Sequence, residues 1–430
     1  MISELVSLPG PSHHYAGYAP GNLASASHAG ATSHPRAAVQ QCLARMHILH
    51  DLGVQQWFLP PLLRPDRALL AAAGLSGNLR QQLTQARDQT PEILSAAWSS
   101  ASMWTANLGT AAPAPDRASD RAGLLLANLA AASHRAIEWQ PRLQQLRACV
   151  IDDSLELIPA LPPLPDFHDE GGANHTRLAD ADGQGLHIFV HSRDGKAPSS
   201  QRFRGRQPRC ASHAAARRLG IPADNCLFVA QHPAAVDAGV FHNDVIMVGQ
   251  GNRLLLHARA WWEQEATLEQ LTQRLPQLRV VCIDDNDLSL DEAIHCYLFN
   301  SQLIHVAGRW HLLAPQECAG GRARMVVDSL LDQGFIDHLH ICDLRQSMDG
   351  GGGPACLRLR VPDNVRFLPQ LSVNTSLITS LDNWAHRHYP ESLRLDDLAS
   401  DDLVQRCRAA HDDLCHILDL PSVLCDETHA

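Results

Sequence analysis

The chain has 430 residues, of which 45% are hydrophobic, so it is long enough to bury a large core. Its formal net charge of −11 argues against a duplex nucleic-acid binder, because phosphate contacts need a clustered lysine and arginine surface. Apolar runs such as 124–132 are far shorter than the roughly 20 residues that span a bilayer, so we expect neither a nucleic-acid nor a membrane partner.

The N-terminal segment and the cysteines indicate a cytoplasmic protein. The opening MISELVSLPG carries Glu4, has no basic start and contains no apolar stretch long enough for a secretory signal, so we interpret it as mature sequence. Twelve cysteines are spread from Cys42 to Cys425, which favours reduced thiols over a disulfide framework. No pair forms CxxC and no HExxH is present, so we predict neither a metal nor another cofactor.

Helical spacing of apolar residues predicts an amphipathic helix over 35–52, which lies between Ser33 and Gly53. Its core-facing positions are Val39, Leu43, Met46 and Leu49. A second helix is predicted over 212–219, between Ser212 as the candidate N-cap and Gly220, and a longer helical region covers much of 395–418.

Short apolar or β-branched runs predict strands that alternate with helical or turn-rich stretches, which is an α/β pattern. The predicted strands are 186–190, 226–230, 245–248, 280–283, 303–306, 338–342 and 357–361. The predicted loops are 111–120, 161–172, 192–208 and 346–354. No repeat or low-complexity tract divides the chain, so we expect a single domain over residues 1–430.

The run MDGGGGPACLRLRV places four glycines and a proline before Cys356, at the predicted start of a strand. Glycines let a backbone approach a ligand closely and adopt positive φ, so this arrangement favours an accessible thiol. On this run alone, a tight turn followed by an ordinary buried cysteine is the commoner arrangement. A nucleophilic role for Cys356 therefore depends on its partners.

Two further runs supply acids and a base. In VFHNDVI, His242 and Asp244 are two residues apart before a predicted strand, so both side chains would point the same way. A histidine near a thiol can act as acid and base, while the aspartate can bind a cation, although HND is also a common turn or strand cap. In HDEGGANH, Glu170 precedes two glycines, where an exposed acidic loop is equally compatible.

Basic residues are candidates for binding an anionic group. In QRFRGRQPRC, most arginines fit a solvated loop, but one or two could hold a carboxylate through the guanidinium fork. These arginines are Arg202, Arg204, Arg206 and Arg209. His134 and Arg135 follow the apolar run 124–132, where the alternative is a helix C-terminus whose dipole they complement.

Seven motifs together resemble the N-succinylarginine dihydrolase family of the pentein, or guanidino-group-modifying, superfamily. The motifs are HHYAGYAPGN, SMWTAN, DEGGANHTR, VFHNDVI, YLFNSQL, PQEC and GGGPACLRLRV, in the same order over nearly the whole chain. The resemblance implies a pseudo-symmetric α/β-propeller of five ββαβ units and a homodimer. It implies hydrolysis of N2-succinylarginine by two waters to N2-succinylornithine, two ammonia and carbon dioxide.

Matching motifs also imply functional residues. The nucleophile would be Cys356, the general acid/base His242 and the supporting acid Glu170. The implied substrate contacts are Ala16, Gly17, Tyr18, Ala19, Pro20, Gly21, Asn22, Leu23, Ala24, Ser25, Asn107, His134, Arg135, Arg206, Asp244 and Gly350.

One position departs from the family pattern. The family usually has asparagine in NGGGPAC where this chain has Gly350, so an amide contact is missing or is supplied by Asp349. A single-step deiminase or an amidinotransferase would use the same Cys–His–carboxylate set. A non-catalytic binding protein with this fold is the alternative of a different class.

Overall fold

The computed structural model describes residues 2–180 and 182–421. Within these ranges, five three-stranded sheets share one pattern: the middle strand pairs antiparallel with one neighbour and parallel with the other. In strand order, the sheets are β3 (Gly109–Ala112), β4 (Ala122–Leu126), β5 (Leu155–Ile158); β6 (His175–Ala179), β7 (Gly185–His191), β8 (Cys226–Ala230); β9 (Met247–Gln250), β10 (Arg253–His257), β11 (Arg279–Ile283); β12 (Gln302–Val306), β13 (Arg309–Pro315), β14 (His338–Cys342); and β15 (Leu359–Pro362), β1 (Ile2–Ser7), β2 (Gln56–Leu59).

A helix connects the two parallel strands of every sheet, because a parallel pair needs a crossover connection. In the same order of sheets, these helices are α7 (Trp139–Cys149), α8 (Arg209–Arg218), α10 (Gln264–Arg274), α12 (Gly321–Asp332) and α2 (Pro35–Asp51). Each unit is therefore a ββαβ unit, and both the α/β class and the five-unit fold are confirmed. No repeat was visible in the sequence because the units share topology and not residues.

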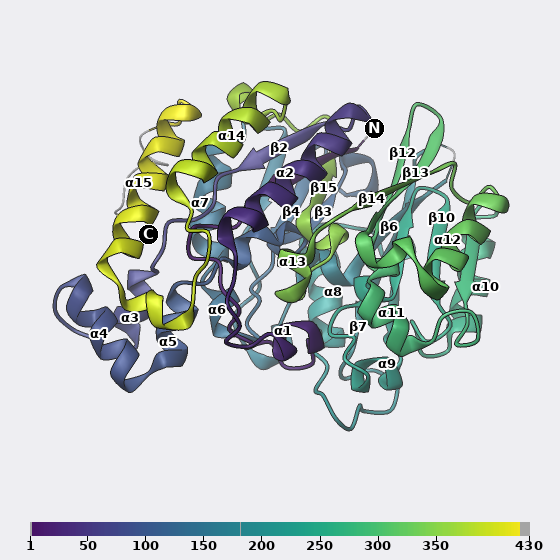
Figure 1. Cartoon of the computed structure of the whole chain (residues 1–430). Helices are drawn as coiled ribbons and strands as arrows, with labels where there is room; N and C mark the ends of the chain where they lie inside the picture. Colours follow the sequence, from purple (N-terminus) through teal and green to yellow (C-terminus); the bar gives the residue numbers. More distant parts are fainter. Residues whose placement is uncertain (1, 181, 422–430) are drawn as a thin grey trace.

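The fifth unit joins the two ends of the chain. Its first strand, β15, comes from the C-terminal part of the sequence and pairs antiparallel with β1, so that Leu5 lies opposite Leu359. On its other side β1 pairs parallel with β2. This arrangement closes the order of units and places the segment after Cys356 beside the N-terminal strand, as Figure 1 shows for β15 and the N-terminus.

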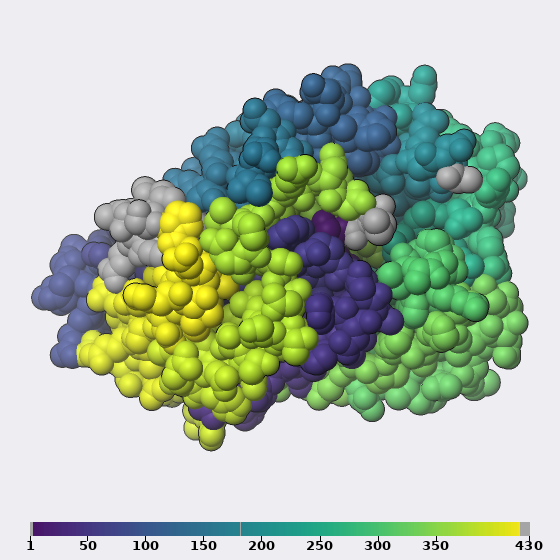
Figure 2. Space-filling model, turned by 90° about the horizontal axis from the view of Figure 1, so that it is seen from above, coloured from purple at the N-terminus to yellow at the C-terminus, as the bar shows by residue number. Residues whose placement is uncertain are grey.

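Further helices lie outside the repeats. They are α1 (Leu23–Ser27), α3 (Arg67–Ala72), α4 (Leu79–Gln89), α5 (Pro91–Ala97), α6 (Ser133–Ala136), α9 (Pro233–Asp237), α11 (Leu290–Cys296), α13 (Arg345–Asp349), α14 (Thr375–His388) and α15 (Asp401–Ile417). The blue α3–α5 and the yellow α15 lie on one side of the molecule in Figure 1. They form one hydrophobic core, which includes Leu83, Trp98 and Leu403. Helix α14 packs on α2, and Figure 2 shows the yellow-green C-terminal segment beside the purple N-terminal segment.

The helix predictions were correct in place and partly wrong in their limits. Helix α2 ends one residue before the predicted limit, with Leu52 as its C-cap, and buries its four predicted core residues. Helix α8 begins at Arg209, because the extended Pro208 is its N-cap, and the predicted cap Ser212 is buried inside the helix. The region 395–418 is interrupted at Ser400, whose side chain caps α15. Cys425 lies outside the described residues.

The strand predictions overlap seven strands, and two of these begin later than predicted. Val245 and Leu357 belong to 3-10 turns, so β9 and β15 start at Met247 and Leu359. Two predicted loops were partly wrong, because β3 includes residues 111 and 112 and α13 covers residues 346–349. Strands β1–β6, β10 and β13 were missed, because most are short or rich in alanine and leucine, which do not distinguish strand from helix.

Candidate active site

Five 3-10 turns form a central ring. Each ends directly before the first strand of one unit or one residue before it: η2 (Thr105–Leu108), η5 (Gly171–Asn174), η7 (Asn243–Val245), η8 (Leu298–Asn300) and η10 (Pro354–Leu357). Each turn contacts the next, and η10 contacts η2, so the ring is closed. The ring brings together the motifs that carry Asn107, Glu170, His242 and Cys356, which are far apart in the chain.

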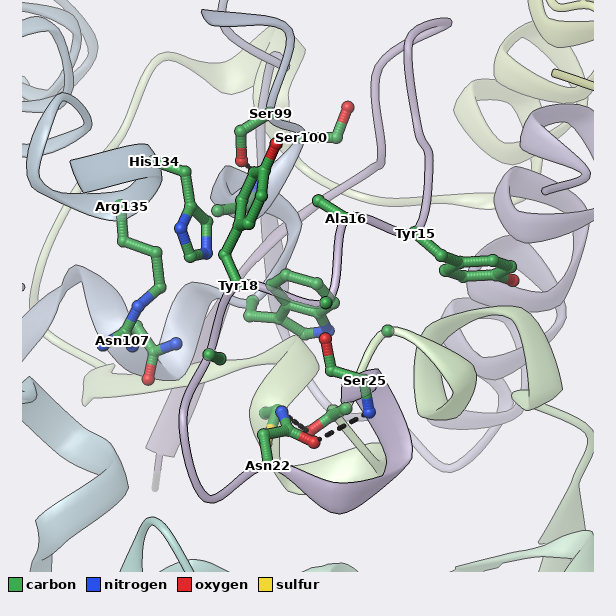
Figure 3. A pocket seen from close by; sticks show the side chains of 18 of the residues that line it. Tyr15, Ala16, Tyr18, Asn22, Ser25, Ser99, Ser100, Asn107, His134 and Arg135 are labelled. Carbon is green, nitrogen blue, oxygen red and sulfur yellow. Dashed lines mark hydrogen bonds between the residues drawn. The ribbon is translucent and has the colours of Figure 1, made fainter. Parts of the chain in front are cut away.

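A cavity of about 60 Å³ opens above this ring. The N-terminal loop forms one wall, and Figure 3 shows Tyr18 between His134 and the Ser99–Ser100 pair, with Asn107 and Arg135 beside His134. The predicted site residues that line the cavity are Ala16, Gly17, Tyr18, Ala19, Asn22, Ser25, Asn107, His134, Arg135, Arg206, His242, Gly350 and Cys356. The predicted residues absent from its wall are Pro20, Gly21, Leu23, Ala24, Glu170 and Asp244.

Several residues of the wall were not among the predicted site residues. They are His13, His14, Tyr15, Ser95, Ser99, Ser100, Ala101, Trp104, Phe241, Gly351 and Gly352. The serine-rich AAWSSAS and the overlapping SMWTAN could have indicated part of this wall. Small and hydroxyl residues in a non-periodic stretch are typical of a loop that can face a ligand.

The sulfur of Cys356 lies beside a carboxylate. Cys356 is buried, and its Sγ is 3.5 Å from Asp244 Oδ2, while Asp244 Oδ1 is buried without a hydrogen-bond partner. Burial and the nearby Asp244 raise the pKa of the Cys356 thiol well above its ordinary value. Burial also raises the pKa of Asp244 to about 7, against the opposing effects of Cys356, Arg358 and Asn300. Asp244 therefore disfavours the Cys356 thiolate in the free protein, and its free carboxylate oxygen beside the thiol forms a receptor for a cation.

The second half of the site is built around Glu170, which is fully buried. Its Oε2 lies 2.6 Å from His242 Nε2, 2.6 Å from Arg135 Nη2 and 3.8 Å from Arg206 Nη1. Burial by itself would raise the pKa of Glu170, but Arg135, His242 and Arg206 outweigh it and hold that pKa well below its usual range. Glu170 is therefore ionised and anchors three donors.

His242 is a neutral imidazole in this setting. Burial lowers the pKa of His242 to about 4, although Glu170 opposes the shift. Because a carboxylate only accepts hydrogen bonds, Nε2 carries the proton that His242 donates to Glu170. Its Nδ1 is buried without a partner and is the free proton acceptor. The geometry thus supplies a thiol, a cation receptor and a base that a carboxylate orients.

Several sequence interpretations need correction. Glu170 is not in an exposed acidic loop, and Cys356 does not open a strand but lies in η10 with its thiol buried at the cavity wall. His242 and Asp244 meet the site through the turn η7 and not through an extended strand. The run 124–132 is not a helix, because its first residues belong to β4; His134 and Arg135 lie in the short α6.

The arginine cluster divides as expected. Arg206 is buried and its Nη2 donates to the Pro20 carbonyl at 2.9 Å, whereas Arg202, Arg204 and Arg209 are exposed. Arg206 therefore fastens the N-terminal loop over the cavity. Burial and the like charges of Arg135 and Arg206 lower the pKa of His134 to about 3, so His134 meets a ligand as a neutral donor.

The glycines before Cys356 pack against side chains of the site. A Cβ on Gly351 would lie 1.8 Å from Asn22 Nδ2, one on Gly352 would lie 2.3 Å from Trp104 Nε1, and the φ of Gly351 is +102°. Trp104 donates to Ser347 Oγ at 3.1 Å, which holds the indole against this run. Close packing is the reason for these glycines, and positive φ is needed only at position 351 among the four.

Restoring the family asparagine at position 350 is expected to destabilise this chain. Gly350 has φ −79°, which any residue adopts, but its Cβ would lie 2.8 Å from a ring carbon of Trp104. We expect Gly350→Asn to cost about 1–3 kcal/mol of the free energy of unfolding, as overpacking does. Urea denaturation measures it. Gly320→Asn is the control, since nothing lies within 4 Å of that Cβ; equal stability of the two variants would contradict the steric argument.

Residues 2–180 and 182–421 contain no group of three histidine, cysteine, aspartate or glutamate side chains arranged to hold a metal ion. None of the helices in the same ranges is both long and apolar enough to cross a bilayer.

Comparison with solved structures defines the class of fold. The arginine dihydrolase ArgZ from the cyanobacterial ornithine–ammonia cycle aligns in its apo structure with a TM-score of 0.53 and 15% identity, over 87% of this chain and 42% of that chain. Its product-bound N-terminal domain aligns with a TM-score of 0.52 and 13% identity, over 84% and 97% of the two chains. At this identity the likeness shows the fold alone, which is the pentein fold of arginine dihydrolases.

Sequence comparison gives the family. The succinylarginine dihydrolase family matches residues 4–425. N-succinylarginine dihydrolases of Pseudomonas aeruginosa, Burkholderia thailandensis and Chromohalobacter salexigens are 39%, 40% and 41% identical to this chain, over 97% of it and 96%, 97% and 96% of their own lengths. The chain belongs to the succinylarginine dihydrolase family, and the resemblance of its motifs is confirmed.

Proposed function

We propose that this chain hydrolyses N2-succinylarginine and two waters to N2-succinylornithine, two ammonia and carbon dioxide. The observation that carries the proposal is that the family match spans nearly the whole chain, while one central ring joins a Cys356–Asp244 pair to a His242–Glu170 pair. A guanidinium needs both pairs. Its delocalised charge makes it a poor electrophile, so a carboxylate must fix it while a thiolate attacks its carbon.

The first step uses the electrostatics of the empty receptor. A guanidinium at Asp244 adds the positive charge that the Cys356–Asp244 pair needs, so both acids ionise more readily once it is bound. The proton of the Cys356 thiol passes to Nδ1 of the neutral His242, whose cation Glu170 stabilises. The thiolate then forms a bond to the guanidinium carbon.

Each later proton transfer also uses His242. The imidazolium gives its proton to one nitrogen of the adduct, and the C–N bond to that nitrogen breaks. Ammonia departs, and a thiouronium remains bound to Cys356. Water attacks that carbon while His242 takes its proton, and breaking of the C–S bond releases a ureido product and the thiol. A second round at the same carbon releases the second ammonia. The resulting carbamate decomposes to the amine and carbon dioxide.

The carboxylates of the substrate need donors at the other end of the cavity. Arg206 and Arg135 remain the candidates, and Arg135 Nε is buried without a partner. Both also contact Glu170, so recognition of the substrate and the orientation of His242 share the same guanidinium groups. The cavity of about 60 Å³ is well below the roughly 300 Å³ of the smallest typical ligand pockets. The loops that form its wall must therefore move for the substrate to enter.

Product counting tests the proposed reaction. The purified chain is incubated in parallel with succinylarginine and with arginine, and ammonia and carbon dioxide are measured from each. Two ammonia for each succinylarginine support the proposal, and arginine should react poorly. One ammonia would indicate a deiminase, transfer to an added amine an amidinotransferase, and no turnover a binding protein; each would overturn the proposed activity.

The affinity for a guanidinium is expected to fall below neutral pH. Asp244 has a pKa of about 7 without ligand and binds the cation only when ionised. The dissociation constant of succinylarginine should therefore rise about tenfold for each pH unit below 7 and level off above it. Calorimetric titration of Cys356→Ser between pH 5.5 and 8 measures this, and His242 stays neutral in that window. Asp244→Asn is the control and should bind weakly at every pH; a pH-independent affinity of Cys356→Ser would remove Asp244 from this role.

We also propose a cytoplasmic homodimer. The cysteines of the described ranges are free thiols, which agrees with a reducing compartment, and the resemblance to the family supports the dimer. Light scattering after size-exclusion chromatography tests the dimer, and a monomer at micromolar concentration would refute it.

A further inference from the structure

The turn η8 is the member of the central ring without an assigned role. The other four turns, or the residue directly before each, carry the predicted site residues Asn107, Glu170, His242, Asp244 and Cys356. Turn η8 lies between η7 and η10, and so between the cation receptor and the nucleophile. Its last residue is Asn300, which is fully buried. Turn η8 therefore places the uncharged amide of Asn300 between the turns that carry Asp244 and Cys356.

The amide of Asn300 contacts both neighbouring turns. Its Nδ2 lies 3.4 Å from Cys356 Sγ and donates to the main-chain oxygen of Asp244 at 3.0 Å. Its Oδ1 is buried without a partner. The side chain is held from the other side by the chain before Cys356, since a Cβ on Gly353 would lie 2.7 Å from that Oδ1. Little room remains for the amide to turn away from the sulfur.

We propose that Asn300 is a further catalytic residue, which donates a hydrogen bond to the sulfur of Cys356 and stabilises the thiolate before attack and again when it leaves. Through the Asp244 carbonyl, the same amide fixes the spacing between the cation receptor and the nucleophile. The proposal rests on the proposed function for its catalytic part, but the hydrogen bond to sulfur is a property of the free protein.

The charges around the sulfur explain why this donor matters. Asp244 from η7 raises the pKa of the Cys356 thiol and so disfavours the thiolate. A negative charge on Cys356 in turn raises the pKa of Tyr297, which precedes η8. Arg358, after η10, acts on Asp244, and His242 faces the same cavity. Asn300 and the Gly353 main-chain N–H are the groups that favour the charged sulfur in the free protein. A hydrogen bond to an ion is about twice as strong as one between neutral groups, so it stabilises the thiolate more than the thiol.

Alkylation of Cys356 tests the hydrogen bond without any turnover. The unmodified chain and Asn300→Leu, which keeps the size but not the donor, react with iodoacetamide from pH 7 to 10, and mass spectrometry follows the peptide that contains Cys356. Below its pKa a thiol reacts in proportion to its thiolate fraction. We expect Asn300→Leu to react roughly tenfold more slowly at each pH, as the loss of a charge-assisted hydrogen bond implies. Its kcat should fall roughly 10–100-fold while KM stays within about threefold.

Three further variants separate this role from a structural one. Asn300→Asp keeps the shape but places a carboxylate beside the sulfur, and it should slow alkylation even more, whereas Asn300→Ser keeps a donor and should restore part of the rate. Gln56→Met is the matched control, because Gln56 is a buried amide that donates to the Met46 carbonyl at 2.8 Å and has an unpartnered Oε1. It should lower thermal stability without changing alkylation of Cys356.

The outcomes judge the two proposals separately. If Asn300→Leu does not fold, Asn300→Asp decides the question, and an alkylation rate equal to that of the unmodified chain in either folded variant overturns the role of Asn300. Failure of the unmodified chain to release ammonia from succinylarginine overturns the proposed function, but it leaves the alkylation result to decide on the hydrogen bond.

Discussion

Cys356→Ser is expected to lower ammonia release from succinylarginine by more than about 10⁴-fold, a loss typical of removing a nucleophile. A serine hydroxyl ionises far less readily than a thiol, and the neighbouring Asp244 disfavours a second negative charge in the free protein. A bound guanidinium that suffices to produce a thiolate does not suffice to produce an alkoxide. Steady-state ammonia release by both proteins measures the difference.

Binding should survive in the same variant. Asp244, His242 and Glu170 are unchanged in Cys356→Ser, so saturating succinylarginine should still raise its free energy of unfolding, by about 2.7 kcal/mol at a concentration 100 times the dissociation constant. Cys210→Ser is the control for loss of a thiol, because Cys210 is exposed and should leave turnover unchanged. Turnover by Cys356→Ser close to that of the unmodified chain would remove Cys356 from the role of nucleophile.

Glu170→Gln is expected to cost both stability and activity. The neutral amide would leave the buried Arg135 and Arg206 without their shared counter-ion, and breaking a buried ion pair typically costs about 3–5 kcal/mol. The imidazolium of His242 would also lose its stabilising carboxylate, so kcat should fall by about 10²–10⁴-fold, the usual contribution of acid–base catalysis. Urea denaturation and ammonia release measure the two effects.

The control for Glu170→Gln is an exposed pair. Glu391 pairs with Arg36 at 2.8 Å and its side chain is 81% exposed, so Glu391→Gln should change stability by less than about 1 kcal/mol and leave turnover unchanged. If Glu170→Gln were as stable and as active as Glu391→Gln, Glu170 would not be the group that orients His242.

In the proposed function, the contacts of Glu170 link recognition of the substrate to His242, the proposed base. Arg206 joins Glu170 and His242 to the N-terminal loop through the Pro20 carbonyl, and Arg135 holds the same carboxylate oxygen. A carboxylate of the substrate that draws on either arginine therefore acts on the environment of His242 as well.

The sequence alone determined which chemistry was available and where some elements lie. The spacing of Val39, Leu43, Met46 and Leu49 determined helix α2, because helical periodicity is a local pattern that the sequence itself displays. The motifs around Cys356, His242 and Glu170 determined the family through residue types in a fixed order. The predicted starts of two strands were wrong, because Val245 and Leu357 are apolar like strand residues but belong to turns of the central ring.

Tertiary structure decided how those residues act. Cys356 lies 112 positions from Asp244, and His242 lies 72 positions from Glu170, so no local pattern could pair them. Glu170 could have been an exposed loop residue; only the ring buries it among two arginines and a histidine. Asn300 lies in the motif YLFNSQL, but the sequence assigned it no role, since an asparagine becomes a partner of sulfur only when two turns meet. The physical reason is that burial and charge act through space, and the fold alone sets those distances.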